Sequence, residues 1–443
     1  MCNTAASLLP PGPPSSENPS ARFLADPFGY LEESFTRWGP LFSLPLGNVG
    51  HVPFSEFAST GDWVFLTSPH HLKVMYETDE KTCTAAEANK LFFGTNEGSV
   101  AYIDGPVHRR RRQMLLPHFG GHADHAALLL AELTRRSAHW PHHAPLRLFP
   151  EFQRITASVI TTVVCGAMPS ADRAFISRLL PATENASSSR AEVLAADAAI
   201  RQRISDHMPH YRHRLRPSDA DILAFLLHAA DKGEEELTDE VVRDEVFSLL
   251  YTGFSTTANT LAWAILRLAD DKAALARLRA EITAHIEGPV APNTVGNLPY
   301  LDAVIRETLR LHPVTALNGV RFTHRALVLD GYCIPAGAVL VHCAYLLQRS
   351  PAVYTSPLSF NPARFLGRSA ERYTWAPFGG GNHLCPGRGF ATQILKAALA
   401  YMVTNFALHR EGPLPAAQLQ GFFMAPADGA AVELCPLDER ESR

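Results

Sequence analysis

The spacing of hydrophobic and polar positions changes along the chain, and the change predicts two kinds of structure. Between about residue 120 and residue 312, apolar residues recur at intervals of three and four, which is the period of a helix with one buried face. The pattern is clearest in the segments FQRITASVITTVV, DEVVRDEVFSLLYTGFSTTANTLAWAILRLA and YLDAVIRETLRL. These segments predict a mostly α-helical core.

A strand-like pattern follows in ALVLDGYCIPAGAVLVHCAY, where β-branched and aliphatic residues flank turn signals at Asp330-Gly331 and at 335–337. A second such region, HVPFSEFASTGDWVFLTS, lies near the N-terminus. We expect strands from both regions to share a sheet. The prediction is therefore one interlocked domain over residues 21–443, mainly α with a minor β region. Residues 1–20, rich in Pro and Ser, are expected to form a flexible lead-in.

The composition of the 443 residues, 46% hydrophobic and 19% charged, is typical of a globular chain that buries a large core. The formal net charge of −4 gives no general basic field, so we expect no nucleic-acid partner. No segment approaches the ~20 apolar residues of a membrane span. The N-terminus also lacks the pattern of a signal peptide. We therefore expect a cytoplasmic monomer without a membrane anchor.

One of the cysteines, Cys385, has neighbours that set it apart. A helical apolar stripe begins after Pro386, and proline suits the first helical position, so Cys385 is predicted to lie at a helix N-terminus. The helix dipole and free amides there favour the thiolate. Upstream, Gly379–Gly381 leave room for a flat, bulky group against the backbone. A cysteine taken alone is more often structural, but this setting favours a ligand.

The segment Phe378-x-x-Gly381-x-His383-x-Cys385-x-Gly387 resembles the haem-binding loop of the cytochrome P-450 monooxygenases. Other segments resembling the family follow in family order from about residue 20 to the C-terminus. The resemblance implies the triangular-prism fold of that family, with haem b between a distal helix and the helix after the cysteine loop. It also implies that Cys385 ligates the haem iron.

A second match is Glu307-x-x-Arg310, which with Arg364 resembles the core ion pair of the family. The implied role is scaffolding. The spacing alone says little, because it also occurs in exposed helix pairs that contribute a few tenths of a kcal/mol. Two such pairs in this chain are Glu132 with Arg135 and Glu240 with Arg243.

Four consecutive arginines, Arg109–Arg112, need a local explanation in a chain of net negative charge. Successive helical residues are about 100° apart, so at least one of them must face inward. His108 and Arg112 are four residues apart and share a face. In the family, the segment DGPxHxxxR binds the haem propionates. The resemblance gives this role to His108 and Arg112, and also to Arg321 and His383; the other three arginines are expected to be solvated.

The stretch Thr252–Thr257 lies midway along a long predicted helix and resembles the distal helix of the family. Thr256 takes the position of the family threonine that helps deliver protons during oxygen activation. The alternative is a hydroxyl bonded to the helix carbonyl four residues earlier. Ser255 stands where the family has an acid. Proton delivery would then be slow, use another acid, or be unnecessary.

The positions matching the substrate contacts of the family are apolar, which favours a terpenoid, fatty acid or steroid-like substrate. Ordinary core packing is an equal alternative for each of them. The residues are Phe92, Phe93, Phe254, Leu317 and Phe423.

The sequence contains no G-x-G-x-x-G dinucleotide fingerprint, so electrons are expected from a separate ferredoxin or flavodoxin and its reductase. The predicted function is insertion of one oxygen atom of O2 into an apolar molecule. Two alternatives stay open: a haem-thiolate isomerase or peroxide-driven catalyst, suggested by Ser255, and a haem sensor without turnover.

Overall fold

The computed structural model groups the chain into two compact units, each described here by itself. We call them the sheet unit (Met1–Gln113, Thr315–Ser359 and Ala370–Cys385) and the helical unit (Met114–Val314, Phe360–Ser369 and Pro386–Arg443). The expected single domain over residues 21–443 stays a prediction. The described residues are 9–47, 61–93, 96, 98–119, 125–184, 189–214, 221–234, 236–367, 371–420 and 423–437.

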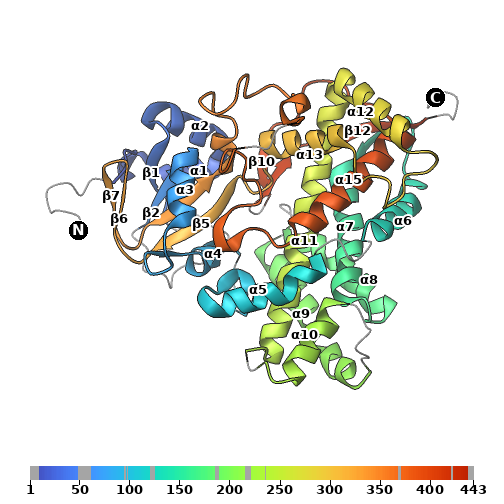
Figure 1. The fold of residues 1–443 in the computed structure, drawn as a ribbon, viewed down its shortest axis with the longest axis horizontal. Coiled ribbons are helices and arrows are strands. Elements are labelled where there is room, and N and C mark those ends of the chain that lie inside the picture. Colours follow the sequence, from blue (N-terminus) through green and yellow to red (C-terminus); the bar gives the residue numbers. More distant parts are fainter. Residues whose placement is uncertain are drawn as a thin grey trace. The chain divides into compact units, whose positions relative to one another are not determined.

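The sheet unit is built on a five-stranded sheet of order β1-β2-β8-β5-β3 (Figure 1). β2 pairs in parallel with β8, which confirms that strands from the two ends of the chain share a sheet. All five residues of β8 are buried. The elements are η1 (Ser15–Glu17), α1 (Pro19–Ala25), α2 (Pro27–Trp38), β1 (Leu41–Pro45), β2 (Asp62–Leu66), α3 (Pro69–Glu77), β3 (Cys83–Thr84), α4 (Ala86–Phe93), η2 (Val100–Tyr102), the first part of α5 (Gly105–Phe119), which ends in the helical unit, β5 (Leu317–Thr323), β6 (Leu327–Leu329), β7 (Tyr332–Ile334), β8 (Val339–Cys343), α14 (Ala344–Leu347) and η5 (Gly381–His383).

Local sequence explains where several elements of the sheet unit begin and turn. α1, α2 and α3 each start with a proline preceded by a residue whose side chain accepts a hydrogen bond from a first-turn amide: Asn18, Asp26 and Ser68. Between β6 and β7, Asp330 and Gly331 both have positive φ, as a two-residue hairpin turn requires. The turns predicted from sequence are therefore confirmed.

The helical unit contains the long helices that the periodicity predicted (Figure 1). α11 begins after Thr238, whose side chain accepts a hydrogen bond from the Val241 amide, and it is buried along most of its length. The elements are α6 (His125–Ser137), β4 (Pro145–Arg147), α7 (Leu148–Cys165), α8 (Ser170–Leu179), η3 (Leu180–Glu184), α9 (Arg190–Arg214), α10 (Ile222–Asp231), α11 (Asp239–Asp270), α12 (Lys272–His285), α13 (Pro299–Leu311), η4 (Pro362–Phe365), α15 (Arg388–Asn405), β9 (Phe406–His409), β10 (Ala417–Gln420), β11 (Phe423–Pro426) and β12 (Ala431–Pro436).

Gly253 lets α11 approach α7 closely. A Cβ at this position would lie 2.7 Å from Cγ1 of Ile160, so a larger residue would push the helices apart. One residue further, the Thr156 hydroxyl of α7 donates to the Phe254 carbonyl at 2.8 Å. The glycine in the middle of α11 thus has a packing reason of its own.

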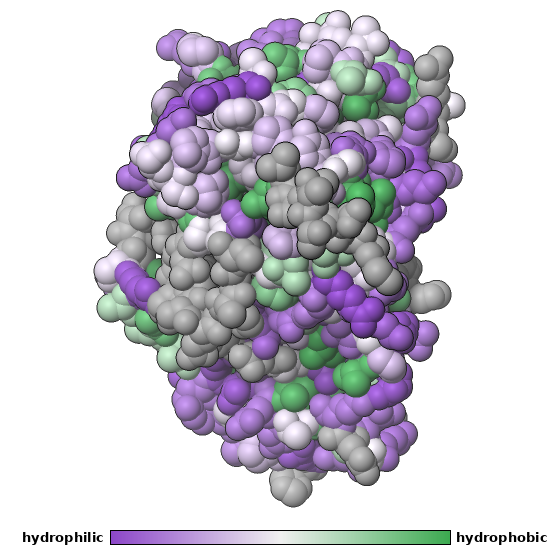
Figure 2. Space-filling model, turned by 90° about the vertical axis from the view of Figure 1, so that its left-hand side faces the viewer, coloured by the Kyte–Doolittle hydropathy of each residue, from purple (hydrophilic) through white to green (hydrophobic). Residues whose placement is uncertain are grey.

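On the face in Figure 2, hydrophilic residues predominate among those described, and hydrophobic ones form small separate spots. Single exposed apolar residues are normal and mark no binding patch. None of the described helices is long and apolar enough to cross a membrane. The large exposed apolar residues are Leu24, Leu116, Leu128, Leu194, Val328 and Leu358.

The ion pair of α13 lies inside the helical unit. Arg310 donates from Nε and Nη2 to Glu307 at 2.7 and 2.8 Å, and both side chains are completely buried. Glu307 also accepts from Arg364 Nε at 3.0 Å and from the Asn361 amide at 2.8 Å. The contacts support the scaffold role that the resemblance implied for all three charged residues.

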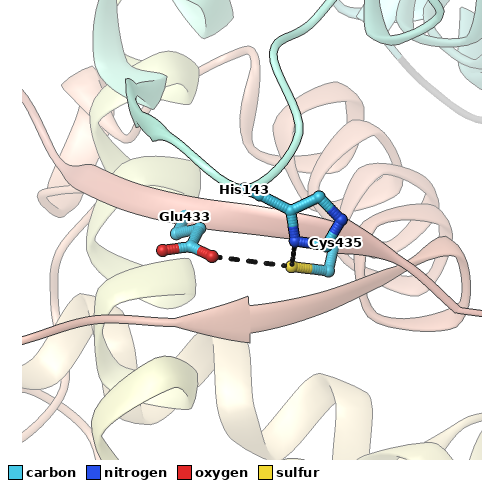
Figure 3. A group of neighbouring side chains, drawn as sticks. All are labelled: His143, Glu433 and Cys435. Atoms are coloured by element: carbon cyan, nitrogen blue, oxygen red, sulfur yellow. Dashed lines mark hydrogen bonds between the residues drawn. The ribbon is translucent and has the colours of Figure 1, made fainter.

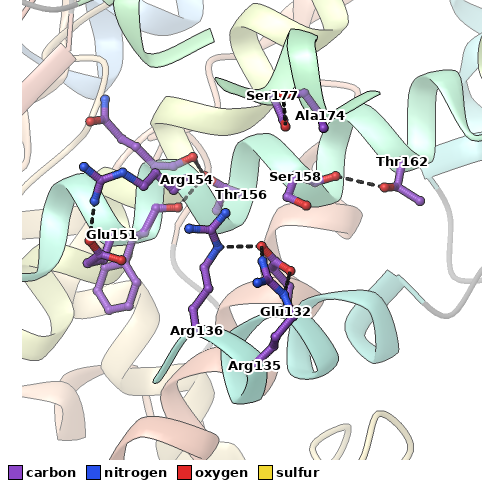
Figure 4. Close-up of polar contacts among 12 residues, drawn as sticks. Glu132, Arg135, Arg136, Glu151, Arg154, Thr156, Ser158, Thr162, Ala174 and Ser177 are labelled. Carbon is purple, nitrogen blue, oxygen red and sulfur yellow. Dashed lines mark hydrogen bonds and ion pairs between the residues drawn. The ribbon is translucent and has the colours of Figure 1, made fainter. Parts of the chain in front are cut away.

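Arg135 and Glu132 offer a matched pair with the same spacing and the same bidentate geometry, at 3.0 and 2.8 Å (Figure 4). The two ion pairs differ in exposure: the Arg135 side chain is 62% exposed, whereas the Arg310 side chain is completely buried. We expect Arg310→Gln to lower the free energy of unfolding by about 3–5 kcal/mol, since it leaves Glu307 as a buried charge without its main partner. Arg135→Gln should cost less than about 1 kcal/mol. Urea unfolding of both variants measures this, and similar losses would contradict it.

Candidate functional site

The Cys385 loop is closed by its own backbone. The Cys385 amide donates to the Phe378 carbonyl at 3.0 Å, and the Leu384 amide donates to the Gly381 carbonyl at 3.3 Å. Asn318 Nδ2 donates to the Pro377 carbonyl at 3.0 Å and ties the loop to β5. The thiol is left half-buried on a fixed turn.

Pro386 does not occupy the first helical position, so that prediction was wrong. α15 begins at Arg388, and Gly387 is the residue before it, with φ −82° and ψ 6°. Pro386 therefore belongs to the turn that leads into the helix. Cys385 still lies three residues before Arg388, the first residue of α15.

Much of the room beside the three glycines is taken by a side chain of the same unit. A Cβ at Gly380 would lie 2.8 Å from Cδ2 of Tyr76, and one at Gly381 would lie 3.4 Å from its Cδ1. The Tyr76 hydroxyl is hydrogen-bonded to His342 Nδ1 at 3.0 Å. The glycines thus have a packing role against Tyr76, which sequence analysis missed because no motif links α3 to this loop.

A chain of polar contacts runs from Asp104 to His108. Asp104 accepts from His383 Nε2 at 2.8 Å and from the Ala86 amide at 2.8 Å. Burial would raise the pKa of Asp104, but these hydrogen bonds lower it overall. Burial lowers the pKa of His383 despite Asp104, so a neutral imidazole donates to a carboxylate. His383 stacks on His108 with ring centroids 4.0 Å apart.

Two arginines in this part of the sheet unit have no carboxylate partner among the residues that the structure describes. Burial lowers the pKa of Arg112, and the only charge that opposes this shift is Cys385. Arg321 is 7% exposed, donates to the Val320 carbonyl at 2.8 Å and lies over the Tyr76 ring. Burial, His383 and Arg112 together lower the pKa of His108 to about 4. The cluster therefore has positive charge that the described chain does not neutralise.

This cluster fits the two carboxylates of haem. Besides the arginines, the buried Nδ1 of His108 has no hydrogen-bond partner among the described residues. Arginine is well suited to carboxylates because its guanidinium donates two parallel hydrogen bonds. The structure thus brings Arg112, Arg321, His108 and His383 together, with Cys385 near Arg112. Their role as propionate ligands stays a prediction.

Arg111 differs from the prediction that it is solvated. Its side chain is buried and donates to the Gly98 carbonyl. Arg109 and Arg110 are exposed as expected, and Arg109 pairs with Glu80 at 3.3 Å. The arginine run thus sends two side chains inward, because a helix places adjacent residues about 100° apart and both Arg111 and Arg112 fall on its inner half.

Cys435 is the other half-buried thiol of the described chain. It lies on β12, where Sγ is 3.2 Å from His143 Nδ1 and 3.7 Å from Glu433 Oε1. Among the described residues, the thiol that acts on Arg112 is Cys385 and not Cys435. The geometry therefore favours Cys385 as the haem ligand.

On α11, the hydroxyl of Thr256 donates to the Thr252 carbonyl at 2.8 Å, which is the ordinary helical arrangement. Thr252 and Thr256 lie one turn apart on the accessible side of the helix, whereas Ser255 and Thr257 are buried. The Ser255 hydroxyl lies 3.4 Å from Asn259 Nδ2. The structure thus leaves the two hydroxyls at 255 and 256 in different environments.

Glu184, at the end of η3, was missed by sequence analysis because a lone glutamate in a loop carries no signal. It is 5% exposed, and neither carboxyl oxygen has a hydrogen-bond partner of normal geometry among the described residues. Burial raises its pKa to about 8, although the nearby hydroxyls of Ser255 and Tyr251 oppose the shift. A protonated acid therefore lies beside Ser255, whose own side chain cannot store a proton.

The predicted substrate contacts are placed unevenly. Phe254 and Phe423 are almost fully buried, and both rings lie near Tyr251, with centroids 6.5 and 6.4 Å away. Leu317 begins β5 and is half-buried. Phe92 and Phe93 end α4, but their side chains lie outside the described residues.

Comparisons with known proteins identify the family of this chain. The family model described as Cytochrome P450 matches residues 153–432. The chain is 30% identical to the putative cytochrome P450 135B1 of Mycobacterium tuberculosis, over 98% of this chain and 93% of that one. It is 29% identical to the putative cytochrome P450 137 of the same organism, over 82% of this chain and 76% of that one.

A solved structure, retinoic acid bound cyanobacterial CYP120A1, has the same fold. The TM-score is 0.80 at 20% identity, over 98% of this chain and all of that one. The match confirms the mainly α fold with small sheets. The family model, the mycobacterial relatives and the fold together establish that this chain belongs to the cytochrome P450 family of haem-thiolate oxidoreductases.

Proposed function

We propose that the protein is a monooxygenase of apolar small molecules whose haem is ligated by Cys385 and held through its propionates by Arg112, Arg321, His108 and His383. The observation that carries this proposal is a cluster of two arginines and two neutral histidines near Cys385, in which the described residues offer the arginines no neutralising carboxylate. Bound haem supplies the oxidation chemistry. The chain supplies orientation, an apolar pocket and protons.

The proposed substrate is terpenoid, fatty acid or steroid-like. The aromatic side chains of Tyr251, Phe254 and Phe423 near the distal helix support an apolar ligand. The structural neighbour CYP120A1 was solved with retinoic acid, another small molecule with an apolar chain. The proposed electron source is a ferredoxin or flavodoxin with its reductase.

Glu184 is proposed as the acid that replaces the missing carboxyl at position 255. Its burial and its closeness to Ser255 and Tyr251 give a proton store next to two hydroxyls that can relay a proton. Thr256, on the accessible side of α11, would receive the proton and pass it on. The presence of this acid favours oxygen activation over an isomerase, the alternative that rested on Ser255.

The reduced carbon monoxide spectrum tests the ligand assignment. The wild type and Cys435→Ser should both give the strongly red-shifted Soret band of thiolate ligation. Cys435 lies on β12 and not in the Cys385 loop, so its loss should leave the proposed iron ligand in place. Cys385→Ser should lose the band. Loss of the band in Cys435→Ser with retention in Cys385→Ser would overturn the assignment.

Haem retention tests the propionate contacts. Arg112→Ala removes charge-assisted hydrogen bonds worth about 1.5–3 kcal/mol, so haem should leave about 10- to 100-fold faster. Arg110→Ala is the matched control, since Arg110 lies on the exposed side of α5. The measurement is transfer of haem to excess apomyoglobin. Equal transfer rates in the two variants would contradict the role of Arg112.

The pH dependence of stability tests the protonation of Glu184. Between about pH 4.5 and 8 the native state holds a proton that the unfolded state has released, so stability must fall as pH rises through this range. We expect the free energy of unfolding of the wild type, relative to Glu184→Gln, to fall by up to about 1.4 kcal/mol per pH unit. Urea titrations at several pH values measure the difference.

Glu240→Gln is the matched control, because Glu240 is an exposed glutamate in the first turn of α11. Its stability relative to the wild type should not show this slope. A second readout is the infrared carbonyl band of a protonated carboxyl at pH 6, which Glu184→Gln should lack. A wild type whose pH profile matches that of Glu184→Gln would rule out a protonated Glu184.

A further inference from the structure

Three metal-binding side chains meet on the three-stranded sheet of the helical unit, outside the haem site. They are His143, Glu433 and Cys435, and their ligand atoms all lie within 4.8 Å of one another (Figure 3). His143 and Cys435 are 292 residues apart in sequence, so no sequence motif signals the group. Thiolate, imidazole and carboxylate together form a donor set typical of zinc.

The fold holds these side chains in place. Glu433 and Cys435 are two residues apart on β12 and therefore point to the same face of the sheet. β12 is paired with β4 on one side and with β9 on the other. His143 lies two residues before β4, and its amide donates to the Leu434 carbonyl at 3.4 Å, which holds this loop on β12.

The distances suit a tetrahedral ion. With zinc–sulfur bonds of about 2.3 Å and zinc–nitrogen or zinc–oxygen bonds of about 2.0–2.1 Å, tetrahedral ligand atoms are about 3.5 Å apart. Cys435 Sγ is 3.2 Å from His143 Nδ1 and 3.7 Å from Glu433 Oε1. Small rotamer adjustments therefore bring all three atoms to bonding distance of one ion.

A candidate for the fourth ligand lies on the neighbouring strand. His409 on β9 is directly opposite Glu433 in the register, and its side chain is exposed. Residues directly opposite each other have Cβ atoms about 4.5–5.5 Å apart, on the same face of the sheet. The ring nitrogens of His409 are not among the ligand atoms that lie within 4.8 Å of one another, so His409 would have to change rotamer to fill the fourth position.

We propose that His143, Glu433 and Cys435 form a binding site for a zinc-like divalent cation. The ion would link the loop before β4 to β12. Such a link joins the C-terminal strand to a segment far away in sequence and stabilises the sheet only when the metal is bound. The site is independent of the haem and of Cys385.

The test uses the untagged, haem-loaded protein after removal of metals with a chelator. Titration with zinc chloride in a calorimeter should give one site per chain in the wild type. The site should be lost in Cys435→Ser and in His143→Asn. Asparagine is chosen because His143 has a φ of 59°, which asparagine tolerates well. His142→Ala, in the same loop, is the matched control and should keep the site.

A second readout follows the thiol itself. Saturating zinc should slow the alkylation of Cys435, mapped by peptide mass spectrometry, in the wild type and in His142→Ala but not in His143→Asn. Unchanged haem content and carbon monoxide spectra show that the variants are folded. Identical zinc isotherms for the wild type and Cys435→Ser, or alkylation of Cys435 at one rate with and without zinc, would overturn the proposal.

Discussion

An ionised side chain that leaves water must find an opposite charge or lose its own charge, because the desolvation penalty amounts to several kcal/mol per ion. Three parts of this protein meet that constraint in three ways. Glu307 is neutralised inside the chain by Arg310 and Arg364. Glu184 is neutralised by a proton. Among the described residues, Arg112 and Arg321 have no carboxylate partner, and the partner proposed for them is the cofactor.

The first of these arrangements has a structural role, and the other two belong to the proposed functional site. The Glu307 network is complete without a ligand, and its effect is to fix α13 against η4. The proposed propionate contacts of the arginine cluster would couple cofactor binding to the stability of this part of the sheet unit. Burial alone keeps the proton on Glu184, and a carboxyl whose pKa is raised by burial is a candidate proton donor.

Close packing imposes a second constraint on the same residues. Gly253 and Gly380 both lie where a Cβ would meet a neighbouring side chain, Ile160 in one case and Tyr76 in the other. Both glycines fall in segments that resemble functional motifs. A motif residue can thus be required by the packing of the scaffold as well as by the chemistry that the scaffold supports.

The sequence by itself determined what depends on local order: the helical and strand periods, the Asp330-Gly331 turn, and the loop around Cys385 with its family pattern. It could not place the helix start after Pro386, bury Arg111, or find Tyr76 beside the glycines. Only the tertiary structure brought Glu184 to Ser255 and His143 to Cys435, because these contacts join segments whose separation carries no periodic signal. Burial, which sets the charge state of such groups, is a property of the packed chain and not of the neighbours in sequence.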